Sequence, residues 1–463
     1  METQQLSRDQ RRAAGKAARS DVPLESHAVL DVDEHRDPVG LLLGQAESRV
    51  PELVPLRHAR MLASPFTFYR GAALPMAADL ARIPNSGLRV QLCGDAHLSN
   101  FGIFAAPDRR LVFDINDFDE TLPGPFEWDV KRLAASFALA GRDNGLSARK
   151  RRGVVLAAVE RYRTAMREFA AMPMLDVWYA RRDVDDALRQ FGDQLSGKAL
   201  ARAQKAIAKA RTRDSSQVEA KLTTVVDGRR RIVSDPPLVV PVEELFDGLG
   251  VKELYTWIRS LIEQYAESLQ SDRRHLLRQF DVVHAARKVV GVGSVGTRAW
   301  IILLDAGDGQ EPLFLQAKEA QRSVLADYCG ESAYENQGQR VVTGQHLLQA
   351  ASDIFLGWQG THIDGGQRDF YVRQLRDWKG AAIVESMTPP TMVVYARLCG
   401  WTLARAHARS GDRVAIASYL GGGDAFDRAI AQFSESYADQ NERDYAALKT
   451  AVEVGRVHAE YGL

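Results

Sequence analysis

The sequence predicts an α+β protein with two lobes, a larger helical lobe and a smaller lobe built mainly of strands. Residues 89–125 combine short apolar runs with turn signals, and amphipathic helical periodicity follows at residues 129–140 and 149–171. A hairpin signal at Asp227–Gly228 precedes residues 281–375, where strand-like runs alternate with glycine-rich turns. Helical periodicity returns after residue 379, so we expect the C-terminal helices to rejoin the helical lobe.

Residues 1–45 are expected to form a partly disordered N-terminal extension, because they are rich in charge and poor in apolar periodicity. They lack the charged-then-apolar pattern of a secretion signal, and the chain has no apolar run long enough to cross a bilayer. The cysteines Cys93, Cys329 and Cys399 lie far apart, which favours a reducing compartment and argues against a zinc site. We therefore expect a cytoplasmic protein without a membrane partner.

The overall composition is that of a globular protein. The chain has 463 residues, of which 45% are hydrophobic and 26% charged, enough for one large core or two medium ones. The formal net charge is zero. No general attraction to nucleic acid is therefore expected.

The second segment, residues 46–275, carries two polar motifs joined by a predicted hairpin. Asp95 and Asn100 lie in the first motif, and Asp117 follows the apolar strand after a turn signal at residues 106–108. The hairpin would return Asp117 beside Asn100. In phosphoryl-transfer enzymes of the protein-kinase type, such an aspartate accepts the proton of an attacking hydroxyl, while the amide and the second carboxylate hold Mg²⁺. The spacing predicts Asp95 as the base and Asn100 and Asp117 as Mg²⁺ ligands of an ATP-using transferase.

A plain loop is the alternative for these motifs, since Asp and Asn are common turn residues whose side chains bond their own backbone. His97, inside the first motif, is a candidate catalytic residue. It could instead only order the loop through a hydrogen bond, because no second histidine lies at metal-ligand spacing.

Residues 60–71, 94–102 and 116–120 resemble the bacterial family catalogued as domain of unknown function 2252, and the resemblance extends over nearly the whole chain. This resemblance implies family membership and no particular activity.

The same motifs are also similar to those of aminoglycoside phosphotransferases and related small-molecule kinases, which carry a G-D-x-H-x-x-N loop followed by a metal aspartate. This second resemblance implies that Asp117, and not Asp114, is the metal aspartate, with Asp119 as an additional candidate ligand. It also implies that Asp129 is a structural residue that holds the catalytic loop.

The third segment, residues 276–378, is expected to be a nucleotide-binding β lobe. Gly291, Gly293 and Gly296 form a G-x-G-x-x-G turn, which also contains Ser294, between two strand-like runs. That placement is typical of the glycine-rich hairpin of kinases, whereas the dinucleotide-binding version runs from strand to helix. The backbone amides of this turn would approach the phosphates of ATP.

Three further residues complete the predicted nucleotide site. Lys318, among apolar residues of the next strand, would contact the α- and β-phosphates; a lysine of an edge strand reaching solvent is the alternative. A predicted helix at residues 334–348 offers Glu335 as the partner of Lys318, with Glu331 as the rival. Val372, in the following buried strand, is the expected hinge residue whose backbone binds adenine.

The order of these features is not that of an ordinary kinase, because the glycine loop and hinge at residues 291–375 follow the catalytic motifs. A C-terminal helix at residues 395–407 resembles the helix that normally leads into the catalytic loop, although residues 74–83 could also fill that role. We therefore expect a circularly permuted protein-kinase-like fold, with residues 379–463 rejoining the helical lobe. Such a permutation is acceptable when the original termini lie close together at the surface.

The favoured function is ATP- and Mg²⁺-dependent phosphotransfer to a hydroxyl of an unknown small-molecule or protein acceptor, with transfer of AMP as an open variant. The alternatives are a nucleotide-binding pseudokinase with a regulatory role and a metal-dependent phosphoesterase for which the glycine loop is incidental. Arg70 could bind a phosphate or carboxylate bidentately or form an internal ion pair. The sequence does not predict the oligomeric state.

Overall fold

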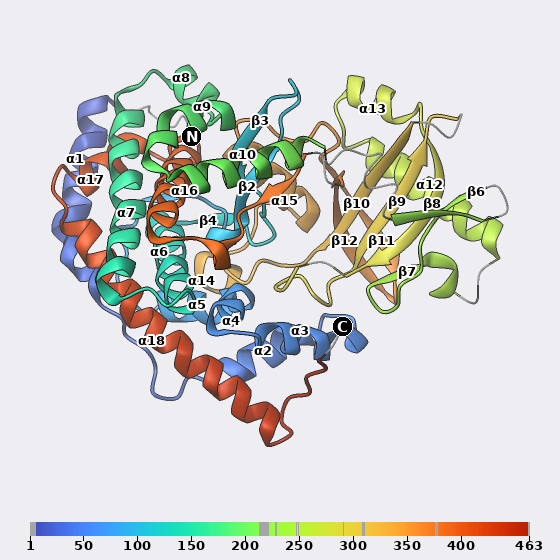
Figure 1. Ribbon diagram of the computed structural model, residues 1–463, viewed down its shortest axis with the longest axis horizontal. Coiled ribbons are helices and arrows are strands. Elements are labelled where there is room, and N and C mark those ends of the chain that lie inside the picture. Colours follow the sequence, from blue (N-terminus) through green and yellow to red (C-terminus); the bar gives the residue numbers. More distant parts are fainter. Residues whose placement is uncertain are drawn as a thin grey trace.

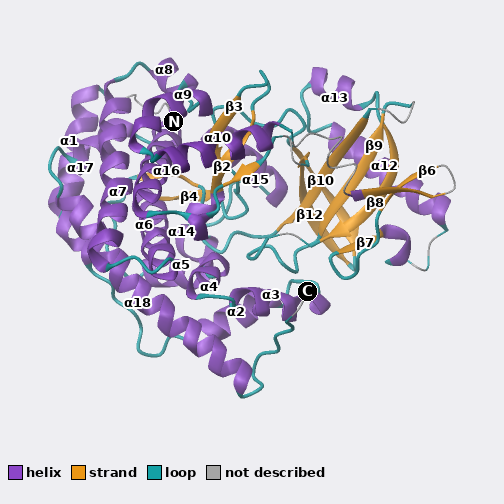
Figure 2. Cartoon of the chain, viewed as in Figure 1, coloured by secondary structure: helices purple, strands orange, loops and turns teal. Residues whose placement is uncertain are grey.

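The computed structural model describes residues 6–461 except residues 213–221, 227–228, 247, 249, 290, 308–310 and 376–377. Most helices lie on one side of the molecule and a large antiparallel sheet lies on the other (Figures 1 and 2). We call the described residues up to 212 and from 378 onward the helical lobe, and the described residues 222–375 the β lobe. The predicted α+β class is confirmed.

The helical lobe is built around α6, which is buried along almost its whole length, and around α7 and α16, which pack side by side. Gly400 of α16 allows this close packing, because a Cβ there would lie 2.2 Å from the backbone oxygen of Ala158 on α7. The helices of the lobe are α1 (Arg8–Asp21), α2 (Pro38–Ala46), α3 (Val54–Met61), α4 (Pro65–Gly71), α5 (Ala73–Leu80), α6 (Phe126–Asp143), α7 (Ala148–Ala171), α8 (Met174–Tyr179), α9 (Val184–Phe191), α10 (Gly197–Arg211), α16 (Pro389–Ser410), α17 (Arg413–Leu420) and α18 (Ala425–Glu453).

The N-terminal region differs from the partly disordered extension expected for residues 1–45. Within its described part, residues 6–45, the chain forms helix α1, the start of α2 and a short 3-10 turn between them. Ser7 and Gln10 form a capping box at the start of α1. The guanidinium of Arg11 lies 2.8 Å from Asp412, and Arg19 donates hydrogen bonds to backbone oxygens of α17. Arg11 and Arg19 thus hold α1 against α17, whereas other charged residues of α1, such as Asp9 and Arg12, are exposed.

Two small sheets in the helical lobe carry the polar motifs. Strands β1 (Arg89–Leu92) and β4 (Leu122–Pro125) pair antiparallel, and β2 (Phe101–Ala105) pairs with β3 (Leu111–Ile115). The short strand β13 (Gly380–Ala381) pairs with β2 after the chain has left the β lobe. The motifs therefore lie where chain from both ends of the sequence meets.

The β lobe contains a six-stranded antiparallel sheet in the order β11-β12-β10-β9-β8-β7. One face packs on α12 and α13 through an apolar core, and the hairpin of β5 and β6 lies against β8. The predicted turn of that hairpin, Asp227–Gly228, lies outside the described residues. The elements are β5 (Thr223–Val226), β6 (Arg229–Ile232), β7 (Val239–Pro241), α12 (Val251–Ala266), α13 (Ser271–Leu277), β8 (Asp281–Lys288), β9 (Ala299–Asp305), β10 (Pro312–Ala320), α14 (Ala326–Cys329), α15 (Gln337–Leu348), β11 (Gly357–Ile363) and β12 (Gly366–Gln374).

Among the described residues, none of the helices combines the length and the apolar character that a membrane crossing requires.

Substituting Gly400 tests the packing of α7 on α16. We expect Gly400→Ala to lower the free energy of unfolding by about 1–3 kcal/mol, because its methyl group would collide with the backbone of α7. Gly153→Ala on α7 is the matched control, since a Cβ there meets nothing within 4 Å, and it should raise stability by up to about 1 kcal/mol through helix propensity. Urea unfolding followed by circular dichroism measures both. Equal effects of the two substitutions would contradict the close packing.

Candidate active site

The first polar motif forms a tight loop between β1 and β2. Gly94 has φ = 85°, a left-handed conformation that glycine adopts readily, and a Cβ there would lie 2.3 Å from the backbone oxygen of Glu120. Asp129, in the first turn of α6, accepts hydrogen bonds from the backbone N–H groups of Cys93 (2.8 Å) and Gly94 (3.1 Å). The expectation that Asp129 holds this loop is confirmed.

Asp95 lies half-buried in this loop. Its Oδ1 accepts a hydrogen bond from Nε of Arg132 at 2.8 Å, and its Oδ2 lies 3.6 Å from Nε2 of His97. Burial raises the pKa of Asp95, although the Arg132 guanidinium opposes this. Burial also holds the pKa of His97 well below its usual range, and the positive charges of Arg70 and Arg132 act in the same direction. Both effects favour the neutral imidazole. The imidazole makes no hydrogen bond to the Asp95 carboxylate, although the backbone N–H of His97 donates to the backbone oxygen of Asp95 at 2.8 Å.

Asn100 ends the loop next to the second motif. Its Nδ2 donates to the backbone oxygen of Asp95 at 2.9 Å, so Oδ1 is the side-chain atom that can bind a metal ion. The backbone oxygen of Asn100 accepts a hydrogen bond from the N–H of Asn116 at 2.8 Å. The predicted hairpin is thus confirmed, and it returns Asp117 beside Asn100. Asp114, in contrast, is buried in an ion pair with Arg405.

Asp119 is bonded from three sides. Its Oδ2 accepts hydrogen bonds from Nζ of Lys318 at 2.7 Å and from the Ser294 hydroxyl at 3.2 Å, and its Oδ1 accepts one from the Tyr371 hydroxyl at 2.6 Å. Burial alone would raise the pKa of Asp119, but the Lys318 ammonium beside it lowers that pKa to about 2. Lys318 also lies 3.9 Å from Asp117. Lys318 of the β lobe thus lies within ion-pair distance of both Asp117 and Asp119.

The alternation of side chains along strands explains this meeting. In β10, Lys318 and Gln316 alternate with apolar residues that pack on the α12 side of the sheet. In β12, Tyr371 lies opposite Lys318, and Arg373 lies opposite Gln316. β10 is an interior strand and Lys318 is 3% exposed, so the alternative of an edge-strand lysine reaching solvent is wrong. The guanidinium of Arg373 donates to the backbone oxygen of Asn116 at 3.3 Å.

The glycine-rich turn joins β8 to β9, as predicted, and reaches the acid cluster through Ser294. Gly291 and Gly296 have φ values of 67° and 89°, which favour glycine. A Cβ at Gly293 would lie 3.2 Å from the backbone oxygen of Arg70. The turn therefore packs against the N-terminal helices of the other lobe.

Glu335 is not the partner of Lys318. It is exposed and lies before α15, which begins only at Gln337 after the N-cap Asn336, so its side chain does not project from the helix. The rival Glu331 pairs instead with Arg322. Lys318 is paired with Asp117 and Asp119 of the second motif instead of with a glutamate on a helix.

Val372 does not border the cavity beside Lys318, where the nucleotide is predicted to bind. It lies between β10 and β11, opposite Ala317 and Gly357, so the sheet uses its backbone, and its side chain belongs to the core under α12. The residues that border the cavity at this point are Gln374 and Leu375, at and just beyond the end of the strand.

Sequence reasoning missed Arg340 of α15, which is 2% exposed. Its guanidinium donates to the backbone oxygens of Thr121 (2.7 Å), Asp119 (2.9 Å) and Gln321 (2.8 Å), and so links α15 to the second motif. It also missed Arg132, Tyr371 and Arg373. The signal in the sequence that could have identified these residues was a polar side chain within an otherwise apolar segment.

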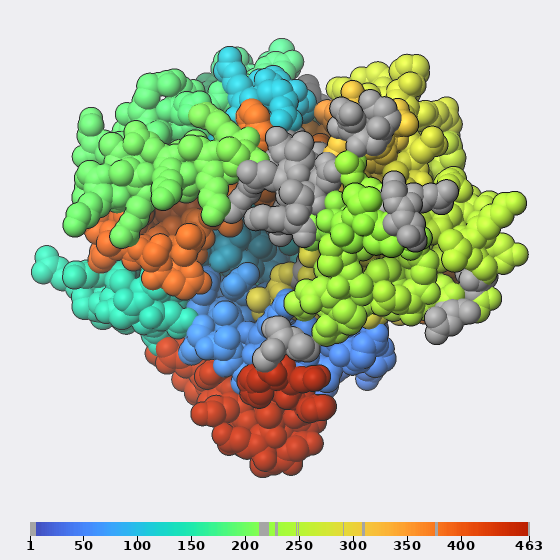
Figure 3. Space-filling model, turned by 45° about the vertical axis from the view of Figure 1, so that its right-hand side comes forward, coloured from blue at the N-terminus to red at the C-terminus, as the bar shows by residue number. Residues whose placement is uncertain are grey.

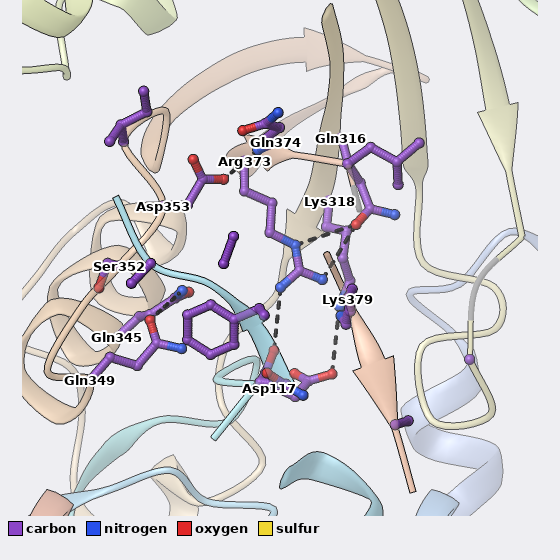
Figure 4. A pocket seen from close by; sticks show the side chains of 18 of the residues that line it. Asp117, Gln316, Lys318, Gln345, Gln349, Ser352, Asp353, Arg373, Gln374 and Lys379 are labelled. Carbon is purple, nitrogen blue, oxygen red and sulfur yellow. Dashed lines mark hydrogen bonds and ion pairs between the residues drawn. The ribbon is translucent and has the colours of Figure 1, made fainter. Parts of the chain in front are cut away.

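Two cavities meet at this cluster. Figure 4 shows Lys318 and Arg373 reaching toward Asp117 across the larger one, whose volume is about 710 Å³. The smaller cavity, of about 360 Å³, is bordered by the first motif. In Figure 3 the surface is hollowed between the yellow-green β lobe and the blue N-terminal helices. The residues common to both cavities are Asp117, Gly291 and Ser294.

The donor set fits a hard cation such as Mg²⁺. Asn100, Asp117 and Asp119 offer an amide oxygen and two carboxylates, and Mg²⁺ in transferases is commonly held by one or two carboxylates together with substrate phosphates. The part of the chain that the structure describes contains no group of three or more acidic, histidine or cysteine side chains that could hold a metal ion.

The family model described as an uncharacterized protein conserved in bacteria (DUF2252) matches residues 49–451. No curated protein and no solved structure matches the chain.

Removing the shared cation should destabilise the protein. We expect Lys318→Met to lower the free energy of unfolding by about 1–3 kcal/mol, less than the 3–5 kcal/mol typical of a fully buried pair, because Asp117 and Asp119 are 31% and 27% exposed. Adding Asp119→Asn should restore part of this loss, since an amide needs no counter-charge. Urea unfolding of the double-mutant cycle measures the coupling. Purely additive losses would mean that Lys318 does not compensate Asp119.

Proposed function

We propose that this chain, which belongs to the DUF2252 family of bacterial proteins, is an ATP- and Mg²⁺-dependent transferase on a circularly permuted kinase-like scaffold. The observation that carries the proposal is the contact of Asp119 with both Lys318 and Ser294. These residues come from three separate motifs, for each of which the sequence alone predicts a role in phosphate or metal binding. Their assembly around one carboxylate favours a single phosphoryl-transfer site over three unrelated features.

The order of elements in the β lobe supports a kinase-like nucleotide site. A glycine-rich turn between the first two strands of the β8-β9-β10 succession is followed by a lysine on the third strand and then by α15. Kinases place the phosphate-binding loop and the lysine in this succession. The cavity of about 710 Å³ under these elements lies within the range of small-molecule and cofactor sites.

The permutation is supported by the position of α16. The chain leaves the β lobe, forms α16 and ends this helix beside β1, where the N–H of Gln91 donates to the Ser410 hydroxyl at 3.2 Å. The hydroxyl of Tyr395, on the same helix, donates to the backbone oxygens of Leu98 (2.8 Å) and Phe101 (3.0 Å) in the first motif. α16 thus contacts the catalytic loop in space although the chain enters that loop from α5 and β1.

The chemistry follows from the two cavities. A hydroxyl of the acceptor, in the smaller cavity, would give its proton to the Asp95 carboxylate while its oxygen forms a bond to the γ-phosphorus. The bond from that phosphorus to the bridging oxygen breaks, and ADP leaves with the electron pair. Lys318 and the glycine-turn amides would hold the phosphates in line. Mg²⁺, bound through Asn100, Asp117 and Asp119, would supply charge neutralisation of the phosphates.

Transfer of AMP uses the same groups, with attack at the α-phosphorus and release of pyrophosphate. A regulatory pseudokinase would bind nucleotide without turnover, and a phosphoesterase would hydrolyse phosphate esters without Lys318. The position of Lys318 at the centre of the acid cluster favours the transferase over the phosphoesterase.

Nucleotide binding is tested by thermal unfolding with ATP, with and without Mg²⁺. We expect a Mg²⁺-dependent rise in Tm, because a ligand that binds only the native state stabilises it, by about 2.7 kcal/mol at a concentration of 100 Kd. Asp117→Ala should abolish the rise. Asp108→Ala, in the exposed turn between β2 and β3, should retain it. The absence of any rise at millimolar ATP in the wild type would contradict the proposal.

The transferred group is tested with ATP labelled in either the γ- or the α-phosphate. Incorporation of γ-label into acceptors of a cell extract indicates phosphotransfer, and incorporation of α-label indicates transfer of AMP. Lys318→Ala should lower either rate by at least about a hundredfold, as removal of a charge-stabilising group commonly does. Hydrolysis of phosphate esters that is unchanged in Lys318→Ala would favour the phosphoesterase instead.

A further inference from the structure

The smaller cavity, which Asp95, Asp117 and Asp119 border, is also bordered by three arginines from the N-terminal region. Arg49 follows α2, Arg57 lies on α3 and Arg70 lies on α4, and all three border the cavity that also contains Asp95. Arg57 is fully buried, Arg49 is 6% exposed and Arg70 is half-buried. Side chains of this charge are seldom buried unless they are paired.

These arginines have no carboxylate partner within 4 Å among the described residues, although the same chain contains many Arg–Asp and Arg–Glu pairs. Arg57 donates only through Nη2, to Gln45 and to the backbone oxygen of Gly71, which leaves Nε and Nη1 buried without a partner. The buried Nε atoms of Arg49 and Arg70 also lack one. The prediction of an internal ion pair for Arg70 is therefore wrong.

The acids of the same cavity form no ion pair with these arginines within 4 Å and bond other groups. Their charges still act on the arginines at longer range, those of Glu120, Asp119 and Glu319 on Arg49, that of Glu120 on Arg57 and that of Asp95 on Arg70. The engaged pairs are Asp95 with Arg132 (2.8 Å), Asp119 with Lys318 (2.7 Å), Glu319 with Arg298 (3.3 Å), Asp327 with Arg322 (2.7 Å), Glu120 with the N–H of Val324 (2.7 Å) and Asp117 with the N–H of Asp119 (3.2 Å).

Burying guanidinium groups without partners is unfavourable. An anion that enters the cavity and accepts their hydrogen bonds makes their burial favourable. Burial lowers the pKa of Arg57, the neighbouring charge of Arg49 lowers it further, and the charge of Glu120 opposes both. Arg fits planar or tetrahedral oxyanions because its donors form a rigid fork.

We propose that Arg49, Arg57 and Arg70 form an anion site for the acceptor, so that the acceptor is a small hydroxyl compound that also bears a phosphate or a carboxylate. This inference rests on the proposed transferase function. The anion would anchor the acceptor against the N-terminal helices and point its hydroxyl at Asp95.

The alternative source of the anion is the terminal phosphate of the nucleotide. One observation favours the acceptor. Lys318, which would hold the nucleotide phosphates, borders the larger cavity, and none of the three arginines borders that cavity. The arginines border instead the cavity of Asp95 and His97, while Gly291 and Ser294 of the glycine turn border both cavities.

The test uses thermal unfolding of the full chain without nucleotide, with glycerol 3-phosphate, glycerate and glycerol as probes. We expect a rise in Tm with the two anions and none with glycerol. Arg70→Gln should weaken the apparent affinity for glycerol 3-phosphate at least about tenfold, as loss of a charge-assisted pair does. Its affinity for ATP with Mg²⁺ should change less than about twofold.

Arg322→Gln is the matched control, because Arg322 borders the same cavity but is engaged by Asp327 and Glu331. It should bind glycerol 3-phosphate as the wild type does. Arg49→Gln is a second test variant, which should weaken the affinity for glycerol 3-phosphate as Arg70→Gln does and keeps the inference testable if one variant fails to fold. The comparison with ATP is made on Arg70→Gln alone, because Arg49 also donates to the backbone oxygen of Val295 in the glycine turn.

Three results would overturn the inference: no anion-dependent rise in the wild type, an unchanged affinity for glycerol 3-phosphate in Arg70→Gln, or an equal loss of ATP and glycerol 3-phosphate binding in that variant. The last result would assign the arginines to the nucleotide. Failure of the transferase itself is separate, since it shows in the wild type as the absence of an ATP-dependent rise.

Discussion

The ion pair between Asp119 of the helical lobe and Lys318 of the β lobe is the interaction on which the candidate site depends. Asp117 and Asp119 are two residues apart, and their carboxylates would repel one another in a partly desolvated cleft. Lys318 supplies a positive charge beside both, which lowers the pKa of Asp119 and opposes the rise that burial and Asp119 cause in the pKa of Asp117. Lys318 lies in an interior strand and Asp119 in the other lobe, so this pair is one of the contacts that join the lobes, together with those of Arg340 and Arg373. Tyr371 and Ser294 bind Asp119 as well, which makes this contact specific in geometry and not only in charge.

Other polar groups hold the loop of the first motif in place beside this pair. Asp129 and Arg132 are three residues apart on α6, so they lie on one face of that helix, where the first binds the loop backbone and the second binds Asp95. Tyr395 fixes the other end of the loop from α16. The candidate base is thus positioned by packed helices and the candidate phosphate-binding lysine by a packed sheet, which is the arrangement that holds reacting groups most accurately.

The parts of this site that sequence reasoning predicted are those set by local chain geometry. The return of Asp117 to Asn100 needs only a short hairpin, and the glycine turn needs only two flanking strands. The partner of Lys318 was mispredicted because it depends on how two lobes dock, and nothing near residue 318 or 335 encodes that contact. The prediction for Val372 concerned its backbone, and it failed because Val372 lies in an interior strand, paired with Ala317 on one side and Gly357 on the other. The sequence around residue 372 does not reveal which strands lie on either side of it. The unpaired state of Arg49, Arg57 and Arg70 is a property of the folded chain alone, since a sequence lists charges but not their partners.

The order of the motifs along the chain accounts for the unusual role of the N-terminal helices. In this chain the segment that leads into the catalytic loop also packs on the glycine turn, through the N–H of Val50 to the backbone oxygen of Gly296 (2.8 Å) and Arg60 to that of Gly291 (2.7 Å). Arg49 donates to the backbone oxygen of Val295 in the same turn. Residues that border the smaller cavity therefore also hold the glycine turn, which borders both cavities. A charge bound by Arg49 would act on a side chain that also contacts this turn.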